Sequence, residues 1–304
     1  MQPTATQSEL RKSVGEQPAS NDARLVYSDY LIEQGETLGE LIAVQCALSA
    51  GDAPNARKLT RRNNQLLKRL AEEWHSADGD SAEGAWKFTK GELEYSDVIR
   101  YRVYADREKL RCRFERGFVD HIESHRLLLQ KRMTWLREEA ALLRSLTCKD
   151  YRGLDGPPQQ LVLDLRALPH LQTLALFPAN LEAVKALSTE PEFSKLRSLS
   201  MERGHLSEAL QEMQLLAKSD VLSSLRALDL YSYGLEADEI RPLASAKFSL
   251  QVLLLNKSNI GSAGATLIAK GKSFAGLVEL GLYNNDLGPT GVAALANSSG
   301  LVHL

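Results

Sequence analysis

Leucines recur at a regular spacing through the second half of the chain. Residues 277–287 read LVELGLYNNDL, in which Leu280 and Leu282 alternate and predict a short strand with one buried face. Beyond this stretch, the spacing of Val292 and Leu295 predicts the inner face of a helix. The same order starts at five positions: Leu171, Leu196, Leu225, Leu250 and Leu277. Successive starts are 25, 29, 25 and 27 residues apart, and such a period predicts a stack of strand–helix units around a shared apolar core.

This pattern resembles the leucine-rich repeat, and the longer units resemble those of the ribonuclease-inhibitor type. The resemblance implies an α/β solenoid with a parallel sheet on its concave side and helices on its convex side. Leu143, Leu146 and Cys148 read as a degenerate first unit. We expect four equivalent leucines to be buried on neighbouring parallel strands: Leu199, Leu228, Leu253 and Leu280.

One feature departs from the family pattern. The position of Asn285 usually holds Asn or Cys, whose side chain ties neighbouring turns together. The equivalent residues in the preceding units are Ala179, Gly204, Tyr233 and Ser258. We therefore expect the earlier units to be irregular.

A second informative stretch, residues 21–45, predicts two helices. Asn21 or Asp22 can cap the first helix by accepting free amide hydrogens, and Gly35 can supply the positive φ that ends it. Within this helix, Leu25 and Val26 are predicted to face the core. The apolar stripe of the second helix consists of Leu38, Leu41, Ile42 and Gln45.

The same stretch resembles a small bacterial domain known as a repeat-companion domain, which precedes leucine-rich and other repeats and has no implied catalytic role. The resemblance rests on Arg24 to Leu31, Gly35, Gly39, Glu40, Trp74 and the Arg116-Gly117-Phe118-Val119 stretch, with mild departures at Ser28 and Tyr30. Arg24, Asp29 and Glu40 are candidates for a binding site. A polar network that joins the two helices is the favoured interpretation of these three residues.

The chain of 304 residues thus divides into three predicted parts. Residues 1–20 are predicted to be flexible, although Glu9 to Glu16 can start a helix that breaks around Gln17-Pro18. Residues 21–125 are predicted to form the companion domain, and 126–304 to form the repeat domain. The companion domain should contain a further helix over 57–75 and a small strand region, in which Leu110, Cys112 and Phe114 alternate and Gly117 starts a turn.

Composition narrows the functional classes. The net charge of −2 favours neither nucleic acid nor membrane as a partner, although residues 57–152 carry 22 Lys and Arg against 16 Asp and Glu. Cys46, Cys112 and Cys148 are too far apart for a zinc signature and fit a reducing compartment. The N-terminal stretch has no apolar run, and no stretch of 18 apolar residues occurs. We therefore expect a cytoplasmic protein.

The sequence contains no recognisable catalytic, phosphate-binding or metal-binding motif. Residues 270–273 end like a phosphate-binding loop, but Thr266 stands where its leading glycine should be. His121 and His125 are four residues apart, although HIESH is not the order of a zinc protease. We expect neither an enzyme nor a bound cofactor or metal.

The predicted sheet offers a better candidate site. If Leu280 and Leu282 point inward, Glu279, Gly281 and Tyr283 point to the concave side. The equivalent row through Gly281 contains Ala175, Ser200, Asp229, Leu254 and Gly281. The candidate binding residues are Phe177, Glu202, Asp229, Tyr231, Asn256, Glu279 and Tyr283. Acids and aromatic anchors favour a protein partner with basic and apolar side chains, whereas ordinary surface aromatics of a sheet would bind nothing.

Two other functions stay open. The repeats resemble those of GTPase activators with leucine-rich repeats, which would make the chain a GTPase regulator. The basic region 57–152 would otherwise bind nucleic acid, with an affinity that falls steeply as salt rises.

Overall fold

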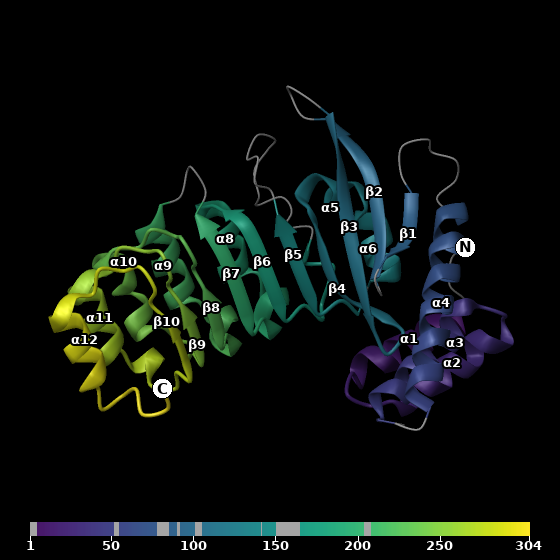
Figure 1. Cartoon of the computed structure of the whole chain (residues 1–304), viewed down its shortest axis with the longest axis horizontal. Helices are drawn as coiled ribbons and strands as arrows, with labels where there is room; N and C mark the ends of the chain where they lie inside the picture. Colours follow the sequence, from purple (N-terminus) through teal and green to yellow (C-terminus); the bar gives the residue numbers. More distant parts are fainter. Residues whose placement is uncertain are drawn as a thin grey trace. The chain divides into compact units, whose positions relative to one another are not determined.

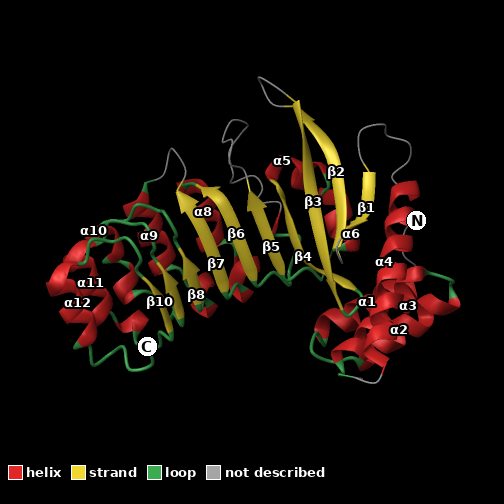
Figure 2. Ribbon diagram, viewed as in Figure 1, coloured by secondary structure: helices red, strands yellow, loops and turns green. Residues whose placement is uncertain are grey.

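The computed structural model describes residues 5–51, 55–77, 85–89, 92–100, 105–140, 142–149, 165–203 and 208–304. The chain forms two compact units, of which unit 1 comprises residues 1–128 and 134–143, and unit 2 comprises 129–133 and 144–304. It is an α/β protein with a helical N-terminal region and ten described strands, most of which pair in parallel (Figures 1 and 2).

The N-terminal helices are α1 (Ala5–Glu16), α2 (Asp22–Glu33), α3 (Thr37–Ser49) and α4 (Ala56–Ala77). The strands β1 (Ala85–Thr89), β2 (Glu92–Arg100), β3 (Ala105–Glu115) and β4 (Phe118–His125) follow, each antiparallel to the next. Two short helices, α5 (Arg126–Lys131) and α6 (Met133–Glu139), come after them.

The strands of unit 2 are β5 (Ser145–Lys149), β6 (Thr173–Ala179), β7 (Ser198–Arg203), β8 (Ala227–Asp229), β9 (Val252–Leu254) and β10 (Glu279–Gly281). The α-helices that alternate with them are α8 (Leu181–Thr189), α9 (Ala209–Lys218), α10 (Ala237–Ile240), α11 (Gly261–Lys270) and α12 (Gly288–Ala296). Short 3-10 helices complete the connections: η2 (Pro191–Lys195), η3 (Val221–Ser224), η4 (Leu243–Ser245) and η5 (Lys272–Phe274).

The six strands of unit 2 pair in sequence order, all in parallel (Figure 2). One row of leucines lies in register across β6 to β10: Leu174, Leu199, Leu228, Leu253 and Leu280. The first four are fully buried, and Leu280 is half-buried on β10, whose described pairing is with β9 alone. The prediction of buried leucines on neighbouring parallel strands is confirmed for Leu199, Leu228 and Leu253, whereas Leu280 is only half-buried. Leu146 and Cys148 are also buried, on β5.

Within unit 2, the hydrogen bonds between successive strand–helix segments follow no single pattern. Asn285 Nδ2 donates to the Leu255 carbonyl over 2.7 Å and so ties its turn to the preceding one. At the equivalent position, Tyr233 is fully buried, and its hydroxyl donates to the Glu212 carboxylate on α9. The larger side chain therefore reaches the preceding helix instead of the preceding turn.

Serine hydroxyls form a second set of bonds near the helix ends. Ser219 Oγ donates to the Ser188 carbonyl over 2.7 Å, and Ser298 Oγ donates to the Ala269 carbonyl over 2.5 Å. Ser273 Oγ donates in the same way to the Leu243 carbonyl. Each bond joins a strand–helix segment to the one before it. The Ser188 and Ala269 carbonyls lie in the last turns of α8 and α11, where carbonyls have no intrahelical partner.

In unit 1, helix α2 buries a different face from the one that the sequence predicted. Leu25 and Val26 were predicted to face the core, but they are 39% and 56% exposed, and this prediction is wrong. Arg24 and Ser28 are buried instead, with Tyr27 and Leu31. The reason is a close approach of α2 to α3, where Ser28 Oγ donates to the Gly39 carbonyl over 2.7 Å. Gly39 leaves room for this approach, because a Cβ there would lie 2.7 Å from the Ile32 backbone nitrogen.

The start of the chain forms helix α1 over residues 5–16, which includes the residues 9–16 that the sequence favoured as a helix. Its Val14 is fully buried against Tyr27 and Leu31. The predicted cap is absent, because Asn21 makes no capping bond and the Asp22 N–H donates to Ser20 Oγ. The φ of Gly35 is +76°, as predicted for the residue that ends α2.

Three tryptophans form an aromatic cluster in unit 1. Trp74 on α4 lies 4.9 Å from Trp86 on β1 and 5.3 Å from Trp135 on α6, measured between ring centroids. They are the only tryptophans of the sequence. Intrinsic tryptophan fluorescence therefore reports on unit 1.

Leu228→Ala removes a fully buried side chain from the centre of the leucine row. We expect the free energy of unfolding to fall by about 2–5 kcal/mol, because the cavity adds to the lost transfer energy. Leu210→Ala, at an exposed position on α9, should change it by less than about 0.5 kcal/mol. Chemical denaturation followed by far-UV circular dichroism measures both, and a loss below about 1 kcal/mol for Leu228→Ala would contradict the core position.

Gly117→Ala should destabilise unit 1 more than Gly35→Ala does. Both glycines have positive φ, at +85° and +76°, which costs a non-glycine residue about 1–2 kcal/mol. Only at Gly117 would the new Cβ collide with backbone, 2.6 Å from the Ile42 Cα, whereas nothing lies within 4 Å at Gly35. We expect a loss of about 3 kcal/mol or more for Gly117→Ala, measured by tryptophan fluorescence during urea denaturation. Equal losses for the two variants would show that the close approach is not real.

Candidate functional site

The predicted binding residues lie on the sheet face of unit 2 opposite the leucine row and in the turns that directly follow its strands. We call this face together with these turns the open face. Its central row is in register as predicted: Ala175, Ser200, Asp229, Leu254 and Gly281. Glu279 is exposed at the start of β10, two residues before Gly281. The open face is therefore continuous over five strands.

Three of the candidate residues lie in turns just beyond the strands. Tyr231, Asn256 and Tyr283 each precede a residue with positive φ, and these residues are Ser232 (57°), Lys257 (56°) and Asn284 (58°). The turns continue the hydrogen bonding of the sheet, since the Ser232 N–H donates to the Asn256 carbonyl and the Lys257 N–H to the Tyr283 carbonyl, both over 2.8 Å. The repeated left-handed residue thus gives the three side chains equivalent places in successive turns.

Polar side chains of the open face hold the tyrosine backbones. Asp229 Oδ1 accepts the Tyr231 N–H over 3.0 Å, and its Oδ2 accepts the Ser200 hydroxyl over 3.1 Å. Asn256 Oδ1 accepts the Tyr283 N–H over 2.8 Å. Gly281 leaves room for this amide, because a Cβ there would lie 2.8 Å from Asn256 Nδ2.

Lys257 adds a positive charge in the turn that follows β9. Its Nζ lies 5.2 Å from the centre of the Tyr231 ring, within the range of a cation–π contact. Hydrogen bonding to Tyr231, and then the charges of Tyr231 and Tyr283, raise the pKa of Lys257 above its ordinary value. The acidic and aromatic side chains of the open face therefore have a lysine side chain among them, next to Tyr231.

The remaining candidates are less closely grouped. Phe177 and Glu202 are half-buried, and the register between β6 and β7 shifts at this point, so that Leu176 pairs with Met201 but Ala179 pairs with Arg203. The structure therefore brings together Asp229, Tyr231, Asn256 and Tyr283 most regularly. Ser200 and Lys257 were missed as site residues because neither stands out in the sequence; their roles depend on which side chains the neighbouring strands place beside them.

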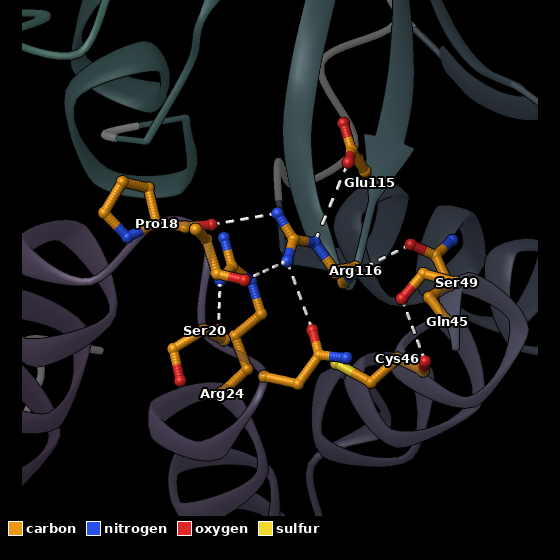
Figure 3. Close-up of polar contacts among 11 residues, drawn as sticks. Pro18, Ser20, Arg24, Gln45, Cys46, Ser49, Glu115 and Arg116 are labelled. Carbon is orange, nitrogen blue, oxygen red and sulfur yellow. Dashed lines mark hydrogen bonds and ion pairs between the residues drawn. The ribbon is translucent and has the colours of Figure 1, made fainter.

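One member of the second candidate set, Arg24, lies beside a polar network around Arg116 in unit 1 (Figure 3). Arg116 Nη1 donates to the Ala19 carbonyl and to Asn21 Oδ1, and its Nη2 donates to the Pro18 carbonyl. Arg24 Nη1 donates to the Ser20 carbonyl over 2.7 Å. The network fastens the segment between α1 and α2 to the β3–β4 turn.

The other members of that set are arranged differently. Asp29 is exposed on α2, and Glu40 binds the Arg62 guanidinium with two bonds of 2.5 and 2.6 Å. Arg24, Asp29 and Glu40 thus do not converge on one point.

Around the Arg116 network, the described residues offer few groups that could react chemically or bind a metal ion. Burial raises the pKa of the Cys46 thiol, and the charges of Arg24 and Arg116 oppose this shift. Within the described ranges, no three His, Cys, Asp or Glu side chains come together in a way that could hold a metal ion. In the same part of the chain, every helix is too short or too polar to cross a membrane.

Comparison with models of known protein families finds no match, and comparison with curated proteins finds none either.

Asp229→Ala should lower the free energy of unfolding by about 1–2 kcal/mol. The half-buried carboxylate accepts two hydrogen bonds, and its loss leaves the Tyr231 N–H without this acceptor. Asp238→Ala provides the control, because that carboxylate is exposed on α10 and its described ion pair is with Arg241 three residues away, which is worth about 0.5 kcal/mol or less. Urea denaturation followed by circular dichroism compares the two variants. If both lose the same amount, Asp229 does not position the Tyr231 turn.

Proposed function

We propose that unit 2 is a leucine-rich repeat domain of the ribonuclease-inhibitor type, preceded by a repeat-companion domain. The in-register leucine row, the parallel strand order and the helix that follows most strands support this proposal. The bond from Asn285 to the preceding turn also fits the role that asparagine has in that family. The open face would then be the concave face of the solenoid.

We further propose that the protein is a non-catalytic module that binds a protein partner through the open face. The observation that carries the proposal is the exposure of two tyrosines there, 44% for Tyr231 and 72% for Tyr283. Tyrosine is enriched among residues that dominate binding energy, since its ring offers a large contact area with little side-chain entropy to lose. Their backbones are held by Asp229 and Asn256, so the two side chains start from defined positions.

The charges of the open face indicate the chemistry of the partner. Glu202, Asp229 and Glu279 supply negative charge, which favours basic side chains and raises the rate of association. Lys257 already lies against the Tyr231 ring. An apolar or aromatic side chain is therefore expected beside Tyr231, whereas Tyr283 can receive either a cation or an apolar group.

Site-specific cross-linking can identify the partner. A photoreactive benzoylphenylalanine replaces Tyr283 on the open face or, as a control, Val292 on α12, which is 56% exposed. We expect a cross-linked protein with the first variant that is absent with the second. The purified partner then serves for affinity measurements.

Tyr231→Ala combined with Tyr283→Ala should weaken binding of that partner by about 30-fold or more, the effect expected from loss of a dominant contact. The pair Arg61→Ala and Arg62→Ala in unit 1 should change the affinity by less than about threefold. The pair Leu210→Ala and Val292→Ala, at exposed positions on α9 and α12, should also be nearly neutral. Isothermal calorimetry with all three double variants makes the comparison.

The reverse result would place the docking site elsewhere. If the tyrosine pair binds normally and the arginine pair fails to bind, the open face is not the docking site and unit 1 is. If the pair on α9 and α12 fails instead, the partner docks on the helices.

A further inference from the structure

Unit 1 contains an open depression of about 660 Å³ beside the first three turns of α4. Its lining side chains are all polar or charged: Glu40, Arg57, Lys58, Arg61, Arg62 and Gln65. Glu40 comes from α3, and the other five come from one face of α4. The volume lies in the range of small-molecule sites, roughly 300–1,000 Å³, but the lining is unlike the mostly apolar surface of such sites.

The charge of the depression is strongly unbalanced. Four cations face one carboxylate, and Glu40 is already bound by Arg62 through both of its oxygens. No ion pair or hydrogen bond of Arg57, Lys58 or Arg61 with an acid occurs among the described residues, and each of these side chains is exposed. Three positive charges therefore remain without a described acidic partner.

Other cations of unit 1 are arranged differently. On β3, Lys109 and Arg111 both lie within 3.2 Å of Glu94, and Arg113 lies 3.5 Å from Glu92. Farther along α4, Arg69 pairs with Glu73 over 3.0 Å. These cations outside the depression are therefore paired with acids, whereas among the described residues Arg57, Lys58 and Arg61 are not.

This arrangement raises the free energy of the free protein. Arg57 and Arg61, and likewise Lys58 and Arg62, are four residues apart on one helix, where like charges repel. They also lie in the first turns of a helix of 22 residues whose first turn has no acid, so that they face the positive end of its dipole. An anion in the depression would relieve both effects.

We propose that this depression binds a small ligand that carries two or more phosphate groups. Guanidinium groups match phosphate oxygens through paired N–H donors, and Lys58 adds a compact charge beside them. Cations spread over two turns of helix suit linked phosphates better than a single anion. The inference is independent of the open face, because it concerns other residues and another chemistry.

The test uses the full chain and inorganic tripolyphosphate as the probe, with isothermal calorimetry at 50 and 300 mM salt. We expect saturable binding that weakens as salt rises, because exposed charges are screened. Absence of saturable binding at 50 mM salt would overturn the proposal. Citrate serves as a carboxylate of similar charge, and equal binding of citrate would overturn the assignment to phosphate.

Two matched double variants locate the site. Arg57→Gln with Arg61→Gln should weaken tripolyphosphate binding by about tenfold or more, because it removes charge-assisted donors. Lys68→Gln with Lys87→Gln removes the same charge from exposed positions outside the depression and should change the affinity by less than about threefold. Equal losses would mean that the probe senses only the diffuse charge of unit 1, and the proposal would be wrong.

A third variant should act in the opposite direction. Glu40→Gln removes the carboxylate that holds Arg62, and we expect binding to tighten by about threefold or more. Tryptophan fluorescence melts without the probe verify that each variant keeps the fold of unit 1. A single-stranded RNA of 12 nucleotides is measured in parallel. If it binds more tightly than tripolyphosphate through the same arginines, the small-ligand proposal is replaced by binding of a nucleic-acid backbone.

Discussion

The structure of unit 2 depends on the parallel pairing of its strands. This pairing places five leucines in one row: Leu174, Leu199, Leu228, Leu253 and Leu280. Strands of three residues, such as β8 and β9, make too few hydrogen bonds to persist alone. Burial of a leucine side chain contributes about 1.5–3 kcal/mol, but only when a neighbouring strand–helix unit covers it. Stability is therefore a property of the stack, and the half-buried Leu280 marks the strand with the fewest described neighbours.

Once the leucines are stacked, the bonds between neighbouring turns can vary. Asn285 makes one such bond, and Tyr233 makes a different one through Glu212 on α9. Serine hydroxyls near the helix ends add bonds to carbonyls of the preceding unit. Because the core already sets the spacing of the turns, several side-chain types can satisfy the buried carbonyls at that spacing.

The two proposed sites rest on different physical features. On the open face, left-handed residues after each strand give Tyr231 and Tyr283 equivalent turn positions, and neighbouring side chains hold their backbones. In the depression of α4, the important feature is charge that the described fold leaves unneutralised. Contact area would dominate binding at the first site, and electrostatic attraction would dominate at the second.

The sequence by itself determined the period of the stack, its buried leucines and the in-register row of the open face, because a repeating strand allows only one face to be apolar. It also determined the end of α2, since Gly35 adopts a φ that other residues avoid. Only the tertiary structure decided which face of α2 is buried. There Arg24 and Ser28 lie inward while Leu25 and Val26 lie outward, because α2 packs closely against Gly39 of α3, where Ser28 Oγ donates to the Gly39 carbonyl. The tertiary structure alone likewise placed Lys257 over Tyr231 and Tyr233 against Glu212, since these contacts join residues that lie 21 to 26 positions apart in the chain.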